Sequence, residues 1–497
     1  MHNNKKHVFT FAYQKVLRPA LPTYFVPKEY REFRDTLIEV NRILESGIEY
    51  RFIVKKMEVL GIDPLTKAAQ RFYTRTSRAL HYCLLLALGD YAHRELAVRV
   101  SDSLLLQWFT TTDGMVPRPY SKSAIDRFEK AWGKDEVEQL IYEVNRAVSE
   151  RETAQELILQ NELDLTHLWV DTTCITANIH YPVDWVLLRD ATRTLIKSIL
   201  VIRRHGLKHR IGPPEQFITE INKLVMEMSH TRKKKHGAKI RKTILRRMKR
   251  LLKTIEAHAR RYYELLDQHW DQTDLSRKQA ETVLSRMQNV IEQLPKAIWQ
   301  AHERMIGERR VDNREKILSL YEPDVRVMVR GKSGAEVEFG NALYLVENED
   351  GLIVDWKYMK EQPPSDSVLV KESIERVIGN YGKPESYTAD RGFSSKANSD
   401  YLHEERIYDA ICPKSVNTLG ERLQEPQFGE LQKRRAGTEA RIGIFKNVYT
   451  GRPLRSKGTH HRGNRIGWCI LAHNLWKLAS MAVENRRQQD GCNRLIA

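Results

Sequence analysis

The chain has 497 residues, 41% of them hydrophobic, which is enough for two to four domains with real cores. Its 82 Lys and Arg residues exceed its 64 Asp and Glu residues and give a formal net charge of +18. This surplus favours a polyanionic partner, nucleic acid first and an anionic membrane surface second. Five scattered cysteines without a Cys-x-x-Cys pair argue against a disulfide framework and favour a reducing compartment.

The sequence contains no segment that predicts membrane insertion or export. The most apolar run, ALHYCLLLAL at 79–88, is too short to span a bilayer. The first residues, MHNNKKHVFTF, lack the apolar region of a signal peptide. We therefore expect a cytoplasmic protein. Cys469 and His473 are spaced like two zinc ligands on a helix, but no second pair completes such a site.

The first part of the chain is predicted to be helical. Residues 1–27 carry early lysines and several prolines and are interpreted as an N-terminal arm. From 28 to about 155, apolar residues recur at three- and four-residue spacing, as in EYREFRDTLIEVNRILESG. This pattern predicts an all-α N-terminal domain.

The period changes at 165–179, where LTHLWVDTTCITANI predicts a buried strand that runs into Asp171. Helical spacing returns from about 184 to 310. Within it, residues 201–260 hold 18 Lys and Arg against 4 Glu. Such a run is usually a solvated helix face, but its concentration favours contact with phosphates. The candidate contacts are Lys233, Lys234, Lys235, Arg241, Arg246 and Arg247.

An α/β order follows the basic helices. Strand patterns resume over 316–358, with a hairpin signal at Glu-Asp-Gly 349–351. After them we expect a helix, a strand that ends at Asp390, a helix, a strand and two long helices, at 365–382, 385–390, 394–405, 409–413, 427–449 and 463–487. If the helical stretch is removed, the first strand leads directly into antiparallel strands.

Two acids stand at the ends of predicted strands. Asp171 follows an apolar strand, where an acid is costly unless it is paired or holds a metal. Asp390 precedes Arg-Gly-Phe and is either a turn or cap residue or a second ligand. Asp184 is interpreted as a structural or supporting group. Asp366 is interpreted as the acidic residue at the start of the next helix.

The long helix near the C-terminus carries one acid among cations, within RRAGTEARIGIFK. Gln432, Arg435, Glu439 and Lys446 fall within about 60° of one another on an α-helix. Arg435 and Glu439 can form an ordinary i,i+4 ion pair. The functional hypothesis instead joins Glu439 to Asp171 and Asp390 in a three-carboxylate site, with the basic side chains on DNA phosphates.

Phosphodiester cleavage explains why such a site would be useful. The nucleophile must approach an anionic phosphate, and two Mg²⁺ ions about 3.5–4 Å apart activate the attacking oxygen and neutralise the leaving one. Mg²⁺ prefers oxygen ligands and keeps several waters, so three carboxylates are sufficient. We therefore expect two Mg²⁺ ions, which Mn²⁺ can replace.

At these residues the sequence resembles the bacterial insertion-sequence transposases of the DDE type. Their signature, Tyr-x2-Arg-x3-Glu-x6-Lys, is matched by Arg435, Glu439 and Lys446, whereas Gln432 replaces the tyrosine. WVDTT and TADRGF resemble the blocks around the first two acids. RGKSGAEVEFGNALYLVENEDG, GWCILAHNLWKLA and ALGDYAHRELAVRVSDSLLLQWFTTT resemble further blocks, so that the resemblance covers roughly residues 65–480.

The resemblance implies an RNase H-like catalytic domain over 160–480, an α/β fold whose mixed sheet is flanked by helices. A basic helical insertion at 185–312 interrupts it, a DNA-binding helical domain at 28–155 precedes it, and a tail at 481–497 follows. It also implies metal-dependent cleavage and strand transfer at terminal inverted repeats by Asp171, Asp390 and Glu439. The expected partners are transposon ends and target DNA, with a homodimer in the synaptic complex and a nucleoid-associated location.

Two alternatives stay open at this point. A related nuclease would use the same three acids to cleave DNA without strand transfer. A DNA-binding protein or repressor derived from a transposase would bind the same ends without catalysis.

Overall fold

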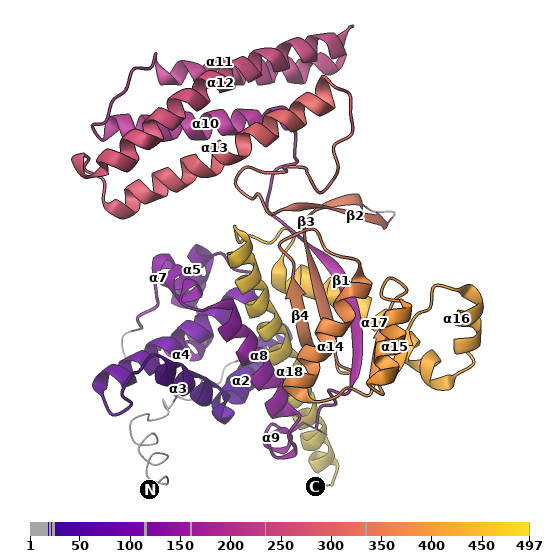
Figure 1. Ribbon diagram of the computed structural model, residues 1–497. Helices are drawn as coiled ribbons and strands as arrows, with labels where there is room; N and C mark the ends of the chain where they lie inside the picture. Colours follow the sequence, from indigo (N-terminus) through magenta and orange to yellow (C-terminus); the bar gives the residue numbers. More distant parts are fainter. Residues whose placement is uncertain are drawn as a thin grey trace.

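The structure, a computed structural model, describes Arg18, Leu21 and residues 25–113, 117–159, 162–233, 235–332 and 335–496. It is a mostly helical protein that contains a six-stranded mixed sheet flanked by helices (Figure 1). A bundle of four long helices is inserted between the first two strands. Most of the predicted N-terminal arm lies outside the described residues.

The N-terminal part is all-α, as its periodicity predicts. Its helices are α2 (Lys28–Ile43), α3 (Glu49–Val59), α4 (Lys67–Leu88), α5 (His93–Asp102), α6 (Leu104–Phe109), α7 (Lys122–Lys130), α8 (Lys134–Val148) and α9 (Arg151–Glu156), with a π-helical turn η1 (Leu44–Ile48) between α2 and α3. Local sequence signals set some of these limits. For example, the Thr66 hydroxyl caps α4 by accepting a hydrogen bond from the Ala69 N–H.

The sheet consists of β1 (His167–Thr176), β2 (Arg326–Lys332), β3 (Ala335–Glu347), β4 (Ile353–Tyr358), β5 (Ser386–Ala389) and β6 (Tyr408–Ile411). Its order is β2-β3-β1-β5-β6, and β4 pairs with β3. Strands β1 to β4 pair antiparallel, whereas β1–β5 and β5–β6 are parallel. The turn between β3 and β4 contains Gly351 at φ 86°, which confirms the predicted hairpin.

Helices cover both faces of the sheet. The 3₁₀ turn η4 (Asp366–Val368) leads into α14 (Leu369–Tyr381), which packs with α15 (Lys396–Glu404) on one face. The other face carries α17 (Pro426–Ile444), which continues as a π-helical segment η5 (Phe445–Thr450), and α18 (Thr459–Ile496). A short helix, α16 (Val416–Arg422), was not predicted and projects from the side of the molecule (Figure 1).

One core joins the N-terminal helices to the sheet. Buried residues of α2, α4 and α8 cluster with α18 and with Leu343, Leu345 and Trp356 of the sheet. Asn474 of α18 donates a hydrogen bond to the Ile353 carbonyl at 2.8 Å. The N-terminal helices therefore pack on the same helix as the sheet.

The inserted bundle has a separate core. Its helices are α10 (Asp184–Arg204), α11 (Pro214–Ser229), α12 (Gly237–His269) and α13 (Arg277–Met305), with short 3₁₀ turns η2 (His230–Lys233) and η3 (Trp270–Gln272). Apolar residues of all four helices form one cluster. Asp184 is buried and pairs with Arg304 at 2.9 Å, which agrees with the structural role expected for it.

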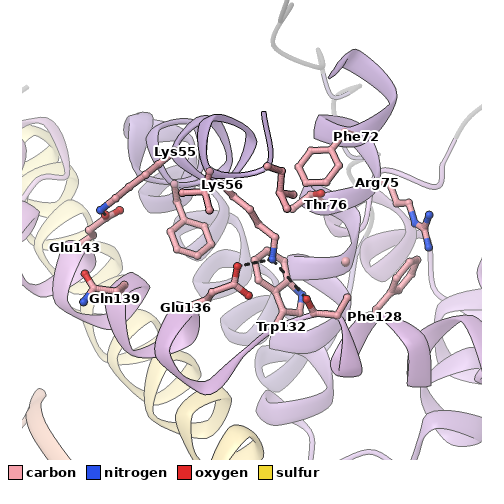
Figure 2. Close-up of a pocket in the computed structure, with 15 residues that line it drawn as sticks. Lys55, Lys56, Phe72, Arg75, Thr76, Phe128, Trp132, Glu136, Gln139 and Glu143 are labelled. Atoms are coloured by element: carbon pink, nitrogen blue, oxygen red, sulfur yellow. Dashed lines mark hydrogen bonds and ion pairs between the residues drawn. The ribbon is translucent and has the colours of Figure 1, made fainter. Parts of the chain in front are cut away.

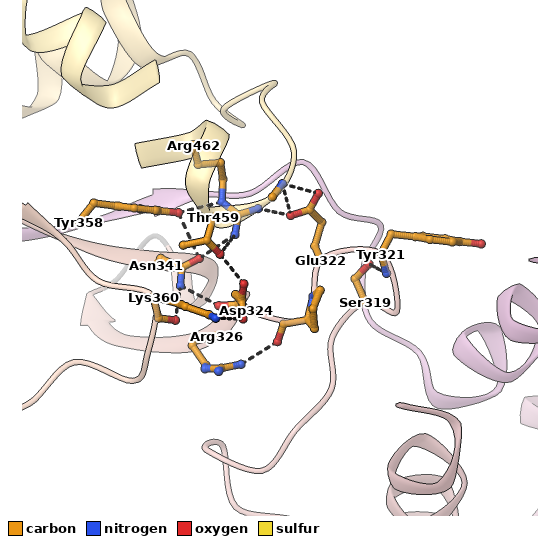
Figure 3. A network of polar contacts seen from close by, with 12 residues as sticks. Ser319, Tyr321, Glu322, Asp324, Arg326, Asn341, Tyr358, Lys360, Thr459 and Arg462 are labelled. Carbon is orange, nitrogen blue, oxygen red and sulfur yellow. Dashed lines mark hydrogen bonds and ion pairs between the residues drawn. The ribbon is translucent and has the colours of Figure 1, made fainter. Parts of the chain in front are cut away.

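A polar network fixes the segment that returns from the bundle to the sheet (Figure 3). Buried Arg462 of α18 pairs with buried Glu322 and donates to the Tyr358 hydroxyl at 2.8 Å. Asp324 accepts a hydrogen bond from Thr459 at 2.5 Å. The base of the bundle is therefore attached to the start of α18 and to the edge of the sheet.

Three expectations need correction. Residues 316–323 form no strand, because Ile317 and Leu320 pack into the bundle core and Leu318 packs beside the sheet. Strand β1 does not stop at Asp171 but continues to Thr176. Helix α18 runs through the expected boundary at 480. In the described part of the chain, no helix has an apolar stretch that would cross a bilayer.

Candidate active site

The parallel pairing of β1 with β5 brings two predicted acids together. Trp169 of β1 is level with Thr388 of β5, and β5 ends one residue later. The same register, extended by two residues, places Asp171 level with Asp390. Since side chains alternate along a strand, both carboxylates lie on the face from which Trp169 contacts α17.

Backbone groups hold both carboxylates. The Thr172 N–H donates to Asp171 Oδ1 at 2.8 Å, and the Gly392 N–H donates to Asp390 Oδ1 at 2.8 Å. A Cβ atom at Gly392 would lie only 2.9 Å from Asp390 Oδ1. Residue 392 therefore has to be glycine for Asp390 to take this position.

Asp171 is partly buried, and its surroundings are unfavourable for a bare negative charge. Burial raises the pKa of Asp171 to about 6, and the carboxylates of Asp390 and Glu439 add to the increase. The Thr172 N–H and the guanidinium of Arg435 act in the opposite direction. The three predicted acids are thus close enough to influence one another.

Helix α17 is attached to the sheet through a buried acid, Glu347, which pairs with two arginines of the helix. Glu347 of β3 accepts hydrogen bonds from Arg434, Arg441 and Thr438 at 2.8, 2.7 and 2.7 Å. Burial alone would raise the pKa of Glu347, but the hydrogen bonds from Arg441 and Arg434 hold it below its usual value. The guanidinium of Arg434 also lies 4.4 Å from the ring centre of Trp169.

The anchored helix presents Arg435 and Glu439 beside the two aspartates. Arg435 Nη1 lies 3.6 Å from Glu439 Oε1, and the Glu439 side chain is 53% exposed. This is the ordinary i,i+4 pair that the spacing allows, and it stands next to the candidate acids at the same time. The cationic helix therefore places one partly exposed acid, paired with Arg435, at the edge of the site.

Two of the predicted DNA contacts have partners inside the protein. Gln432 donates to the carbonyls of Ala389 and Ala410 at 3.1 and 2.6 Å, and so ties α17 to the ends of β5 and β6. Lys446 is 4% exposed, and its Nζ donates to the Thr173 hydroxyl at 3.3 Å. These bonds give both residues a role in positioning the helix, and their contact with DNA stays a prediction.

The predicted basic segment lies at one end of the bundle. Arg241, Arg246 and Arg247 are on α12, where Arg246 and Arg247 are exposed and Arg247 pairs with Glu227 at 3.1 Å. Lys235 is exposed just before the helix. Lys233 ends η2, and Lys234 lies outside the described residues. Lys242 pairs with Glu308 just beyond α13, so this basic end adjoins the segment that returns to the sheet.

A second basic surface, on the N-terminal helices, was not predicted from the sequence. A hollow of about 610 Å³ on α4 and α7 is lined by Lys67, Arg71, Arg75, Arg78 and Arg127, and no acidic residue of the described ranges lines it. The first four residues have spacings of four, four and three, which place them on one face of α4. That spacing was visible in the sequence and could have identified the surface.

An apolar groove adjoins this hollow on the N-terminal helices (Figure 2). Phe52, Phe72 and Trp132 line it, and Lys56 Nζ lies 4.5 Å from the ring centre of Trp132 while it pairs with Glu136 at 2.6 Å.

The donor atoms at the acids suit a hard cation. In the described ranges, no three His, Cys, Asp or Glu side chains lie close enough together to hold one ion as they stand. Buried polar atoms beside the acids nevertheless lack hydrogen-bond partners among the described residues, among them Arg435 Nε and the hydroxyl of fully buried Thr388. Carboxylate oxygens with unsatisfied polar neighbours fit Mg²⁺ and its bound waters. Cys469 and His473 are buried in the core instead.

Comparisons with protein-family models, with curated proteins and with solved structures give no match for this chain.

Proposed function

We propose that this protein is a DDE transposase that binds terminal inverted repeats and catalyses metal-dependent DNA cleavage and strand transfer. The catalytic part would be an RNase H-like domain interrupted by the basic bundle. The observation that carries the proposal is the register of β1 with β5, which puts Asp171 and Asp390 side by side under the helix that carries Glu439. These acids come from three segments far apart in the sequence.

Each residue of the site has a role that follows from its place. Asp171, Asp390 and Glu439 would hold two Mg²⁺ ions through their carboxylate oxygens. Bound there, the ions would activate the attacking oxygen and neutralise the leaving oxygen. Thr172 and Gly392 fix two of the carboxylates through their N–H groups.

Arg435 is suited to contact a phosphate of the bound DNA. Its guanidinium stands beside Glu439 with one buried nitrogen that has no partner in the described part of the chain. A phosphate oxygen would supply that partner and compensate the charge.

Two basic surfaces outside the site support binding of a long DNA duplex. The hollow on α4 and α7 and the basic end of α12 belong to different parts of the fold. The net charge of +18 agrees with displacement of counterions from many phosphates. A homodimer in which each copy holds one transposon end belongs to the same proposal.

The proposal is tested with a DNA fragment that carries the inverted repeats of the protein's own element. We expect the wild-type protein to cut and join this fragment in the presence of Mg²⁺ or Mn²⁺ and to do neither in EDTA. Asp390→Asn should bind the fragment without cutting it. Asp409→Asn is the matched control. Asp409 is a partly buried aspartate on β6, and it is level with Tyr387, which lies on the face of the sheet opposite to the three acids.

A repressor-like DNA-binding protein is the second candidate. It is favoured by the absence, within the described ranges, of three acids close enough to hold an ion as they stand. Tight binding of the ends by the wild type and by Asp390→Asn, without cleavage by either protein, would select this second candidate.

A further inference from the structure

The turn that carries Asp366 is tied to the loop that carries Asp390. Buried Asn398 of α15 donates from its amide to the Ser367 carbonyl at 2.9 Å and to the Phe393 carbonyl at 2.8 Å. One side chain therefore holds two segments that lie more than twenty residues apart in the sequence. These two hydrogen bonds fix the position of the Asp366 turn relative to the Asp390 loop.

The two carboxylates face each other across Gly392. A Cβ atom at Gly392 would lie 2.9 Å from Asp390 Oδ1 and 3.2 Å from Asp366 Oδ2. Both oxygens thus approach the same point beside the loop. The expectation that Asp366 is only an acidic residue at a helix start is incomplete, since its side chain reaches the candidate site.

Asp366 also reaches the neighbourhood of the first acid. The Thr172 hydroxyl lies beside its carboxylate, and the N–H of the same threonine holds Asp171. None of Asp171, Asp366 and Asp390 forms an ion pair with a Lys or Arg in the described part of the chain. Although Arg435 lies near Asp171, the three partly buried carboxylates have no directly paired cation among the described residues, which is costly unless a cation binds.

An orphaned polar atom points to a ligand at the same place. Thr388 is 0% exposed, and its hydroxyl has no hydrogen-bond partner among the described residues. It lies two residues before Asp390 on β5, so its side chain is on the same face of the sheet. A water bound to a cation at the carboxylates would give this hydroxyl a partner.

We propose that Asp366 is a fourth acid of the candidate metal centre, a positioning residue that faces Asp390 across Gly392. This inference rests on the proposed function, because it assumes that a divalent cation binds at Asp171 and Asp390. A fourth carboxylate beside the three predicted acids strengthens the attraction for divalent cations. Asp366 supplies this charge across Gly392 from Asp390.

The test measures cation binding without DNA. The thermal midpoint of the full chain is recorded against Mn²⁺ concentration, since an ion that binds only the folded protein raises this midpoint. The proteins are wild type, Asp366→Asn, Asp366→Glu, Asp390→Asn and the control Asp409→Asn. We expect Asp366→Asn to need at least about tenfold more Mn²⁺ than wild type for the same rise of the thermal midpoint. Asp366→Glu should recover part of the affinity, and the control should match wild type.

The outcomes separate this inference from the proposed function. If wild type shifts, Asp390→Asn does not, and Asp366→Asn matches wild type, Asp366 is no part of the centre and only this inference fails. If wild type shows no Mn²⁺-dependent shift, the metal centre itself is refuted, together with the inference. If Asp366→Asn does not fold, Asp366→Glu decides, and a curve shifted no more than that of the control overturns the inference.

Discussion

The ion network around Glu347 provides the most quantitative test of how α17 is held. Glu347 is 5% exposed and binds two arginines and a threonine. Removal of one partner from a buried ion pair costs about 3–5 kcal/mol. The side chains of Arg434 and Arg441 are 20% and 27% exposed, so water solvates part of their charge. We therefore expect Glu347→Gln to lower the free energy of unfolding by about 3 kcal/mol, the low end of that range.

Urea unfolding followed by tryptophan fluorescence measures this loss, because Trp169 lies against Arg434. The matched control is Glu372→Gln, because the Glu372 side chain is 51% exposed and each of its ion pairs, with Lys357 and Arg376, is worth less than about 1 kcal/mol. Equal losses for Glu347→Gln and Glu372→Gln would contradict the role given to Glu347.

The pH dependence of the unfolding free energy provides a second test of the same network. The folded-state pKa of Glu347 is lowered, so its stabilisation is present above the unfolded value of about 4.3 and is lost as the pH falls through the folded value. The difference in unfolding free energy between wild type and Glu347→Gln should therefore shrink on acidification below pH 4.3 or so.

Further predictions concern the site and the basic surface. Because the folded-state pKa of Asp171 is raised to about 6, its charge destabilises the ion-free protein at high pH and not at low pH. Asp171→Asn in EDTA should therefore raise the unfolding free energy at pH 8 by at most about 3 kcal/mol, with the gain lost as the pH falls to about 4. Combined Arg71→Glu and Arg75→Glu should weaken DNA binding in a fluorescence titration and reduce the salt slope by about 0.9 for each lost phosphate contact. Arg151→Glu, at an exposed position outside that hollow, should leave both quantities unchanged.

The order of the elements, and the acids at two of the strands, could be predicted from the sequence. The apolar and β-branched residues around Asp171 and the short segment Ser-Tyr-Thr-Ala before Asp390 sufficed to predict β1 and β5. Their parallel register, which makes the two acids neighbours, depends on the tertiary fold. The place of Asp366 beside Asp390 could not be predicted for the same reason, because only the fold brings its turn against the loop at Gly392.

The stripe predicted on the long helix differs from expectation in one respect, the burial of Lys446. The α-helical period holds through Ile444, so Arg435 and Glu439 share a side as expected. Lys446 falls in the π-helical segment Phe445–Thr450, where wider turns shift the phase, and its side chain is buried. The spacing of residues in the sequence does not predict that change of period.

The three-acid site is tested most directly by cleavage and joining of the element's own ends by Glu439→Gln, with Glu430→Gln as the control on an exposed position of the same helix. If Glu439 holds a metal ion, the Glu439 variant should bind the ends but neither cut nor join them in Mg²⁺ or Mn²⁺. The control should behave like wild type. If both variants cut and join like wild type, Glu439 is only the ion-pair partner of Arg435 and the three-acid site is wrong.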